Sequence, residues 1–209
     1  MRELTTLTTE QLSVQELYKL MTGLIIPRPI GWIGTYGADR TPNLAPYSFF
    51  QCIATNPPVV LFSTGVNTGH DGQPNIKDSL ANARSSGCFT TNIVDHDLSV
   101  AMNATSAAVP SEVDEFGLAG LTATEFGHVD APGVAEAKAV LECRVVNEMV
   151  LGNEPLTHAV TFGEVIAFHI DDSVLDGTRV KAEELDALGR LAGTMYTTTR
   201  EQFSMQKPD

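Results

Sequence analysis

The chain has 209 residues, of which 43% are hydrophobic and 19% are charged, and its mean hydropathy is −0.01. These values are typical of a folded globule and exclude an intrinsically disordered chain. The net charge is −13, and residues 81–209 carry most of it, with 8 Lys and Arg against 20 Asp and Glu. Because there is no block of basic residues, neither nucleic acid nor an anionic membrane is expected as a partner.

Targeting signals and disulfides are not expected. No apolar run approaches the roughly 18 residues of a membrane span, and the first residues lack the apolar core of a signal peptide. The three cysteines, Cys52, Cys88 and Cys143, lie far apart without a C-x-x-C pair. We expect each to pack as a small hydrophobic side chain in a reducing compartment. The sequence therefore predicts a cytoplasmic protein with one domain over residues 1–209.

A helix is predicted near the start of the chain. Ser13 and Glu16 have the spacing of a capping box, and an apolar stripe follows them over about two turns. Gly23 and the prolines that begin at Pro27 end this pattern. We therefore expect a helix over residues 13–22.

Strand patterns dominate the rest of the chain. Segments rich in β-branched and aromatic residues predict strands over residues 30–36, 43–50, 59–63, 88–94, 139–151 and 159–170. Gly37–Arg40 is expected to form a hairpin turn, residues 77–83 and 98–105 short helices, and residues 106–116 a loop. These elements indicate a mainly β fold, a closed or partly open antiparallel β-barrel with peripheral helices. The motifs G-x-G-x-x-G and G-x-x-x-x-G-K-[ST] do not occur, so a doubly wound nucleotide-binding fold is excluded.

The segment from Asn67 to Ser79 is a candidate anion site. It is rich in Gly, Asn and Asp, and its last residues, Lys77, Asp78 and Ser79, stand where a helix is expected to begin, with Asp78 or Ser79 as its cap. A cation and a hydroxyl at a helix N-terminus suit a phosphate group. The alternative is a plain helix cap beside a solvated lysine.

The strand over residues 43–50 is a candidate surface for a flat ring. On an extended strand Asn43, Ala45, Tyr47 and Phe49 face one side, and the intervening residues face the other. Pro46 removes a backbone donor, which predicts an edge strand or a bulge. Aromatic residues on a strand more often belong to the core, and that alternative stays open.

An ordered set of short motifs runs through nearly the whole chain. They are Ala45–Phe50, Lys77–Ser79, Ala101–Ser106, Val113–Phe116, Leu141–Cys143, Gly163–Val165 and Gly189–Tyr196, where Ala192 replaces a glycine. The set resembles the flavin reductase-like proteins and their longer flavoredoxin-like branch, from about Leu20 to Arg200. The resemblance implies the Greek-key FMN-binding split barrel and a homodimer with the flavin at the interface.

The same resemblance implies the site residues. Those implied for FMN are Arg28, Asn43, Ala45, Pro46, Tyr47, Ser48, Phe49, Ser63, Lys77, Asp78 and Ser79, and those implied for a substrate are His158, Arg190 and Tyr196. The implied activity is that of an oxidoreductase that passes electrons from NAD(P)H through bound FMN to a flavin, a monooxygenase partner or another acceptor. No catalytic side chain is expected, because the flavin carries the redox chemistry.

The use of NAD(P)H is left open by the residues before His158. His158, Gly163 and Val165 match the family spacing, but Leu156 and Thr157 stand where many members carry Gly-Asp. One alternative is therefore a non-enzymatic flavin-binding electron carrier. Another is a barrel of the related pyridoxamine-phosphate oxidase or haem-handling groups.

The remaining histidines predict no metal site. His70, His96 and His128 have no partners at metal-ligand spacing along the sequence. His169 is expected at the end of a strand. We therefore expect no metal.

Overall fold

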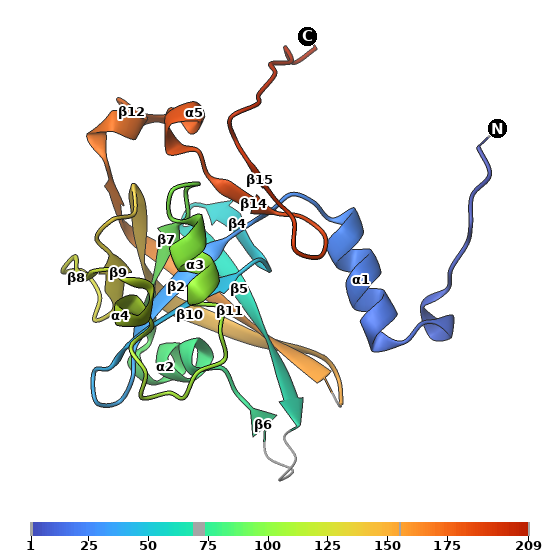
Figure 1. Cartoon of the computed structure of the whole chain (residues 1–209), viewed down its shortest axis with the longest axis horizontal. Coiled ribbons are helices and arrows are strands. Elements are labelled where there is room, and N and C mark those ends of the chain that lie inside the picture. Colours follow the sequence, from blue (N-terminus) through green and yellow to red (C-terminus); the bar gives the residue numbers. More distant parts are fainter. Residues whose placement is uncertain (1, 69–73, 155, 209) are drawn as a thin grey trace.

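A computed structural model describes residues 2–68, 74–154 and 156–208 of the chain (Figure 1). Its first long helix, α1 (Val14–Leu24), begins with the predicted capping box, in which Ser13 Oγ accepts from the Glu16 amide and Glu16 Oε2 accepts from the Ser13 amide. The helix ends two residues later than predicted. It stands beside the barrel instead of packing along it (Figure 1), and Thr22 is its only buried residue.

The main sheet closes into a barrel. Its long strands are β2 (Gly31–Tyr36), β3 (Pro42–Tyr47), β4 (Phe50–Thr55), β5 (Pro58–Thr68), β7 (Cys88–Ile93), β10 (Ala139–Asn153) and β11 (Leu156–Ile170). They pair antiparallel in the order β3-β2-β7-β10-β11-β5-β4. The two outermost strands, β3 and β4, are joined by Ser48 and Phe49 alone, and the Ser63 amide of β5 donates to the Phe49 carbonyl at 2.9 Å. The predicted mainly β barrel is therefore confirmed.

The strand predicted over residues 43–50 is in fact two strands. The chain bends at Ser48 and Phe49, and the prediction missed β4 altogether. Pro46 lies on β3, and among the described residues β3 pairs with β2 alone, so the predicted edge position is confirmed. The bend takes the polypeptide from one edge of the sheet to the other. The alternation of residue types along a strand carries no information about such a change of edge.

Shorter elements surround the barrel. They are α2 (Asp78–Ser86), α3 (Ser99–Ala104), α4 (Glu115–Ala119), α5 (Ala182–Leu185), β1 (Arg28–Pro29), β6 (Pro74–Asn75), β8 (Ala123–Glu125), β9 (Pro132–Val134), β12 (Leu175–Asp176), β13 (Arg179–Val180), β14 (Leu188–Arg190), β15 (Tyr196–Thr198) and the 3-10 turns Thr9–Gln11 and Asp172–Val174. The helices α2 and α3 and the hairpin turn at Gly37–Arg40 match the predictions. Within the described residues, no helix is long and apolar enough to cross a membrane.

Two apolar clusters hold the barrel together. One lies inside it, where the rings of Phe62 and Phe89 meet edge to face with centroids 5.0 Å apart. Gly163 of β11 must be a glycine there, because a Cβ would lie 2.3 Å from the Phe89 ring. The other cluster is centred on the fully buried Trp32, whose indole N–H donates to Thr105 Oγ1 at 2.9 Å. That bond fixes the end of α3 against the barrel.

The cysteine prediction holds in part. Cys52, Cys88 and Cys143 are all unpaired, and Cys88 and Cys143 are buried as expected. Cys52 lies on β4 and is exposed, so its predicted burial is wrong. It occupies an outward-facing position of the strand that the sequence patterns did not reveal.

Candidate functional site

Two adjoining clefts follow β3. The α2 cleft, about 440 Å³, lies between β3, the start of α2 and residues 105–111. The α1 cleft, about 250 Å³, lies between the end of β3, α1 and the turn that joins β14 to β15. Pro46 and Ser106 line both clefts, which therefore meet beside β3.

A buried hydrogen-bond network forms the floor of the α2 cleft. Asn43 Oδ1 accepts from Ser79 Oγ at 2.9 Å and from Thr35 Oγ1 at 3.1 Å. Asn43 Nδ2 donates to both Glu115 oxygens, at 3.0 and 3.1 Å, and Glu115 also accepts from the Leu44 amide at 3.2 Å. The network ties α2 and α4 to the edge strand and makes the floor rigid.

Lys77, and not the predicted Asp78 or Ser79, is the N-cap residue of α2, and its side chain makes no capping bond. The Lys77 side chain is exposed at the cleft, whereas Ser79 is buried and donates its hydroxyl to Asn43. The groups at this end that suit an anion are therefore the Lys77 ammonium and the first backbone amides of the helix.

Burial raises the pKa values of two acidic side chains at the α2 cleft, Tyr47 and Glu115. It raises the pKa of Tyr47 to about 12, even though a hydrogen bond with Ser79 opposes the shift. Burial also raises the pKa of Glu115, against the hydrogen bonds from Leu44 and Asn43, and the charge of Asp78 raises it further. One cation thus stands beside two carboxyl groups, which limits the net attraction of this end for anions.

Arg28 builds the back of the α1 cleft. The side chain is buried and donates to the carbonyls of Thr22 at 2.5 Å, Ile25 at 3.0 Å and Leu191 at 3.1 Å, and to Ser48 Oγ at 3.3 Å. It therefore binds α1, β3 and the β14–β15 turn to one another. Most of its donors are occupied by these bonds, and it lies in the cleft that does not contain Lys77.

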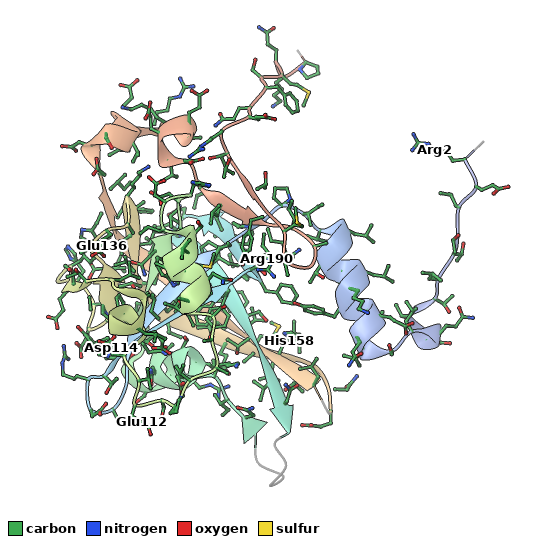
Figure 2. The ribbon with its side chains drawn as sticks, viewed as in Figure 1. Arg2, Glu112, Asp114, Glu136, His158 and Arg190 are labelled. Carbon is green, nitrogen blue, oxygen red and sulfur yellow. The ribbon has the colours of Figure 1, made fainter. Side chains whose placement is uncertain are left out.

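Arg190 and Tyr196 form the outer wall of the α1 cleft. The Arg190 guanidinium lies 4.4 Å from the centre of the Tyr196 ring, and it donates to the Tyr196 hydroxyl and, at 2.5 Å, to the Gly193 carbonyl. Arg190 and His158 both lie on the side of the barrel that faces α1 (Figure 2). The wall presents a cation and an aromatic edge to the cleft.

Phe49, Ser63 and His158 form a separate group next to the α1 cleft. His158 Nδ1 lies 3.4 Å from Ser63 Oγ, and its ring centroid lies 5.8 Å from that of Phe49. Phe49 in turn contacts Tyr18, which lines the cleft. The other predicted site residues line one or both clefts, but these three line neither.

Sequence reasoning missed Tyr18, Thr22, Glu115 and the wall of residues 105–111. Tyr18 was one of several members of an apolar stripe, and nothing in the stripe distinguishes it from the others. Thr105 and Ser106 end a motif that the family resemblance includes, so their place near the site could have been expected. Glu115 likewise belongs to a motif of that set, Val113–Phe116, but its contact with Asn43 could not have been expected, since 72 residues separate the two.

The positions of the histidines match the prediction in one case and differ from it in another. His169 lies near the end of β11, as expected. The prediction that His128 has no ligand partners is wrong in space, because Glu142 and His169 lie beside it. His70 lies outside the described residues.

The comparisons with known proteins place the chain among described relatives. The sequence profile of the flavin reductase like domain matches residues 22–187. An uncharacterized protein of Deinococcus radiodurans is 39% identical over 196 residues, covering 90% of this chain and 83% of that protein. Nitrilotriacetate monooxygenase component B from Bacillus cereus is 32% identical with a TM-score of 0.92, covering 98% of this chain and 100% of that one. Flavoredoxin of Desulfovibrio vulgaris shares the fold, with a TM-score of 0.71 at 20% identity over 87% of this chain and 91% of that one.

Proposed function

Because the chain belongs to the flavin reductase-like family, we propose that it binds FMN in the two clefts along β3 and acts as an oxidoreductase. The observation that carries the proposal is the pairing of two adjoining clefts with different chemistry. One has an exposed lysine at a helix start, and the other is walled by Arg190 and aromatic rings. A phosphate tail suits the first, and a flat ring suits the second.

The size and the donors of the clefts fit this ligand. Together the clefts fall within the ~300–1,000 Å³ of small-molecule sites. Lys77 and the start of α2 would hold the phosphate, and Ser48 and the backbone beside Pro46 would meet the ring and the chain that joins it to the phosphate. Bound FMN would supply the hydride- and electron-transfer chemistry that side chains lack.

The chain's own residues would then hold and orient the flavin and shield it from water. Asn43 and Ser79 keep the cleft floor rigid, and Arg28 keeps α1 and the β14–β15 turn in place around the ring end. Arg190 and Tyr196 stand where a second molecule would approach, and we assign them, with His158, to substrate contact. Proton transfer by a side chain is not required in this scheme.

We further propose a homodimer in which a second copy covers α1. This helix exposes its apolar residues Val14, Tyr18, Met21, Leu24 and Ile25, each at least half accessible. The second half of β10 exposes Val146, Met149, Val150 and Leu151 as well. Large apolar side chains exposed along a helix and a strand in this way are typical of an interface. Since Tyr18 and Thr22 of α1 line the ring end, the second copy would also complete the site.

As electron donor we propose NAD(P)H, and as acceptor a second flavin, a monooxygenase component or another redox partner. The likeness to a protein named as a monooxygenase component supports the monooxygenase alternative. A second candidate function, electron carriage without direct use of NAD(P)H, is favoured by one observation. Leu156 and Thr157 precede His158 in place of Gly-Asp, and the His158 ring is engaged with Ser63 and Phe49.

Two measurements test these proposals in order. Titration of the purified protein with FMN and with riboflavin should show tighter binding of FMN, and equal affinities would contradict the phosphate site. Anaerobic stopped-flow mixing of the FMN-loaded protein with NADH or NADPH should then bleach the flavin absorbance rapidly. If neither NADH nor NADPH bleaches the flavin while dithionite does, the result would favour an electron carrier that does not use NAD(P)H.

A further inference from the structure

Three side chains that the flavin site does not use gather on another part of the barrel. Glu142 lies on β10, His169 near the end of β11, and His128 in the segment between β8 and β9. One ligand atom from each lies within 4.8 Å of those of the other two. The β8–β9 hairpin is on the side of the barrel away from α1 (Figure 1). We propose that these residues form a binding site for a divalent transition-metal ion, with Zn²⁺ as the best fit.

The carboxylate of Glu142 is held in place for this role. The side chain is fully buried, and its Oε1 accepts from the backbone amides of His128 at 2.9 Å and Val129 at 3.0 Å. The other oxygen, Oε2, contacts His169 Nε2 at 2.6 Å. Two amides thus fix the carboxylate and aim Oε2 at the imidazoles, an arrangement that outer hydrogen bonds provide in metal sites.

The two imidazoles differ in mobility. The His169 ring packs on the Phe126 ring with centroids 4.4 Å apart, so its orientation is set. The His128 side chain is exposed, its ring centroid lies 6.0 Å from that of His169, and no hydrogen bond to its ring is found in the described part of the chain. His128 can therefore turn toward an ion at little cost, while the other two ligands wait in position.

Ligand chemistry selects the ion. Two imidazole nitrogens and one carboxylate oxygen suit Zn²⁺ at about 2.0–2.2 Å, whereas Mg²⁺ and Ca²⁺ prefer oxygen ligands alone. To bind, His169 Nε2 would release to solvent the proton that it shares with Glu142 Oε2, and both atoms would contact the ion instead of each other. The two atoms would move apart from 2.6 Å by roughly 0.8 Å, because ligands about 2.1 Å from a tetrahedral ion lie about 3.4 Å from one another. Three protein ligands leave a further coordination position for water on the exposed side of His128.

The ion would fasten the β8–β9 connection to the two longest strands. In the absence of an ion, Glu142 already joins the same parts through its two amide contacts and His169. The competing interpretation is therefore a plain hydrogen-bonded pair, for which His128 has no role. His128→Ala distinguishes the metal site from the plain hydrogen-bonded pair. It removes one metal ligand and keeps the backbone amide of residue 128, from which Glu142 accepts a hydrogen bond.

The experiment uses the full-length protein, freed of metal by chelation and titrated with Zn²⁺ by calorimetry. We expect one saturable site, an affinity at least tenfold weaker in His128→Ala, and a rise in melting temperature on adding Zn²⁺ that the variant loses. The matched control is His96→Ala, which removes another exposed histidine beside an acidic residue, Asp97. It should bind Zn²⁺ as the unaltered protein does, and Mg²⁺ should not compete.

Three outcomes would overturn the proposal. One is weak, unsaturable uptake of Zn²⁺, as the negative net charge of the protein would give without a site. Another is equal affinity in His128→Ala and the unaltered protein. The third is an equal loss in His96→Ala and His128→Ala. A metal-free melting temperature that is unchanged in His128→Ala would show that the comparison is made between folded proteins.

Discussion

The α2 cleft places one cation against two acidic residues. Lys77 is exposed at its mouth, Asp78 follows in the chain, and Glu115 lies buried in the floor. Opposite charges that line the same cleft reduce the attraction for a phosphate that the lysine alone would provide. The affinity for FMN should therefore respond to changes at Lys77 and Glu115 in opposite directions.

Removal of the lysine tests the phosphate end. We expect Lys77→Ala to weaken FMN binding by roughly 1.5 kcal/mol, the lower end for a hydrogen bond to a charged group, because the side chain is exposed and screened. Riboflavin lacks the phosphate and should bind as before. The matched control is Ser48→Ala at the other cleft, which should weaken both ligands similarly. Fluorescence titration measures all four affinities, and unchanged FMN binding in Lys77→Ala would make this lysine a solvated helix residue.

Removal of the buried charge tests the floor. The folded-state pKa of Glu115 is raised by burial, so the folded protein keeps this proton at pH values where the unfolded chain has lost it. The free energy of unfolding contributed by this group therefore falls as pH rises from the ordinary value of about 4.3 through the raised one, by about 1.4 kcal/mol for each unit of separation. In Glu115→Gln the amide oxygen can still accept hydrogen bonds from Asn43 and Leu44. The variant has no titrating group at this position, so this fall in the free energy of unfolding with rising pH is lost.

Urea denaturation at several pH values between about 4 and 7 measures the difference. The stability of Glu115→Gln relative to the unaltered protein should rise with pH over this range, and the variant should bind FMN more tightly at neutral pH. Glu112→Gln, an exposed residue of the same segment, is the control and should show neither effect. A constant difference between Glu115→Gln and the unaltered protein would contradict the argument.

Among the elements, β11 depends on a glycine that lets the barrel interior close. A Cβ on Gly163 would meet Phe89 at 2.3 Å and Cys143 at 3.1 Å. We expect Gly163→Ala to lower the free energy of unfolding by roughly 1–3 kcal/mol, the cost of overpacking a core. Gly23→Ala in α1, where a Cβ meets nothing within 4 Å, should instead be neutral or stabilising. Equal effects of the two substitutions on the urea midpoint would refute the close-packing explanation.

The elements also show how far sequence reasoning reaches. The capping box at Ser13 and the β-branched and aromatic residues of β10 and β11 are local signals, and they located those elements to within a few residues. The bend at Ser48 has no such signal, because it follows from closure of the barrel between distant strands. The residues of the candidate site also divide into those with a local sequence signal and those without one. Lys77 and Ser79 could be found from one helix start, whereas the contact of Glu115 with Asn43 exists only in the fold.

The α1 helix is where the molecule would meet its second copy. Leu24 is 78% exposed at the end of the apolar face. We expect Leu24→Glu to weaken the dimer at least tenfold, since burying a leucine contributes about 1.5–3 kcal/mol and a tenfold change corresponds to about 1.4 kcal/mol. Val100→Glu on α3, where the valine is 81% exposed, is the control and should not alter the dimer. Light scattering at micromolar concentration gives the mass, and a monomer in the unaltered protein would rule out the dimer.

On the scale of the whole molecule, the charge works against the proposed ligand. The net charge of −13 would repel the anionic FMN at long range, while in the proposed site Lys77 would attract its phosphate at short range. Salt weakens the long-range part more, because exposed charges farther apart than the ~10 Å screening length at 0.1 M are largely screened. The balance between the two effects should therefore be readable from the salt dependence of binding.

This gives a prediction that involves the lysine and the overall charge together. In Lys77→Ala no charged side chain at the start of α2 opposes the long-range repulsion, so raising the salt concentration from about 20 to about 500 mM should strengthen FMN binding by several-fold. The unaltered protein should show a smaller rise or a fall, because salt also screens the lysine contact. Riboflavin binding should be insensitive to salt in both proteins, which controls for effects on the fold. Identical FMN salt dependences in the two proteins would mean that the Lys77 ammonium does not contact the phosphate. The attraction would then have to come from the backbone amides at the start of α2, since Arg28 is engaged in the other cleft.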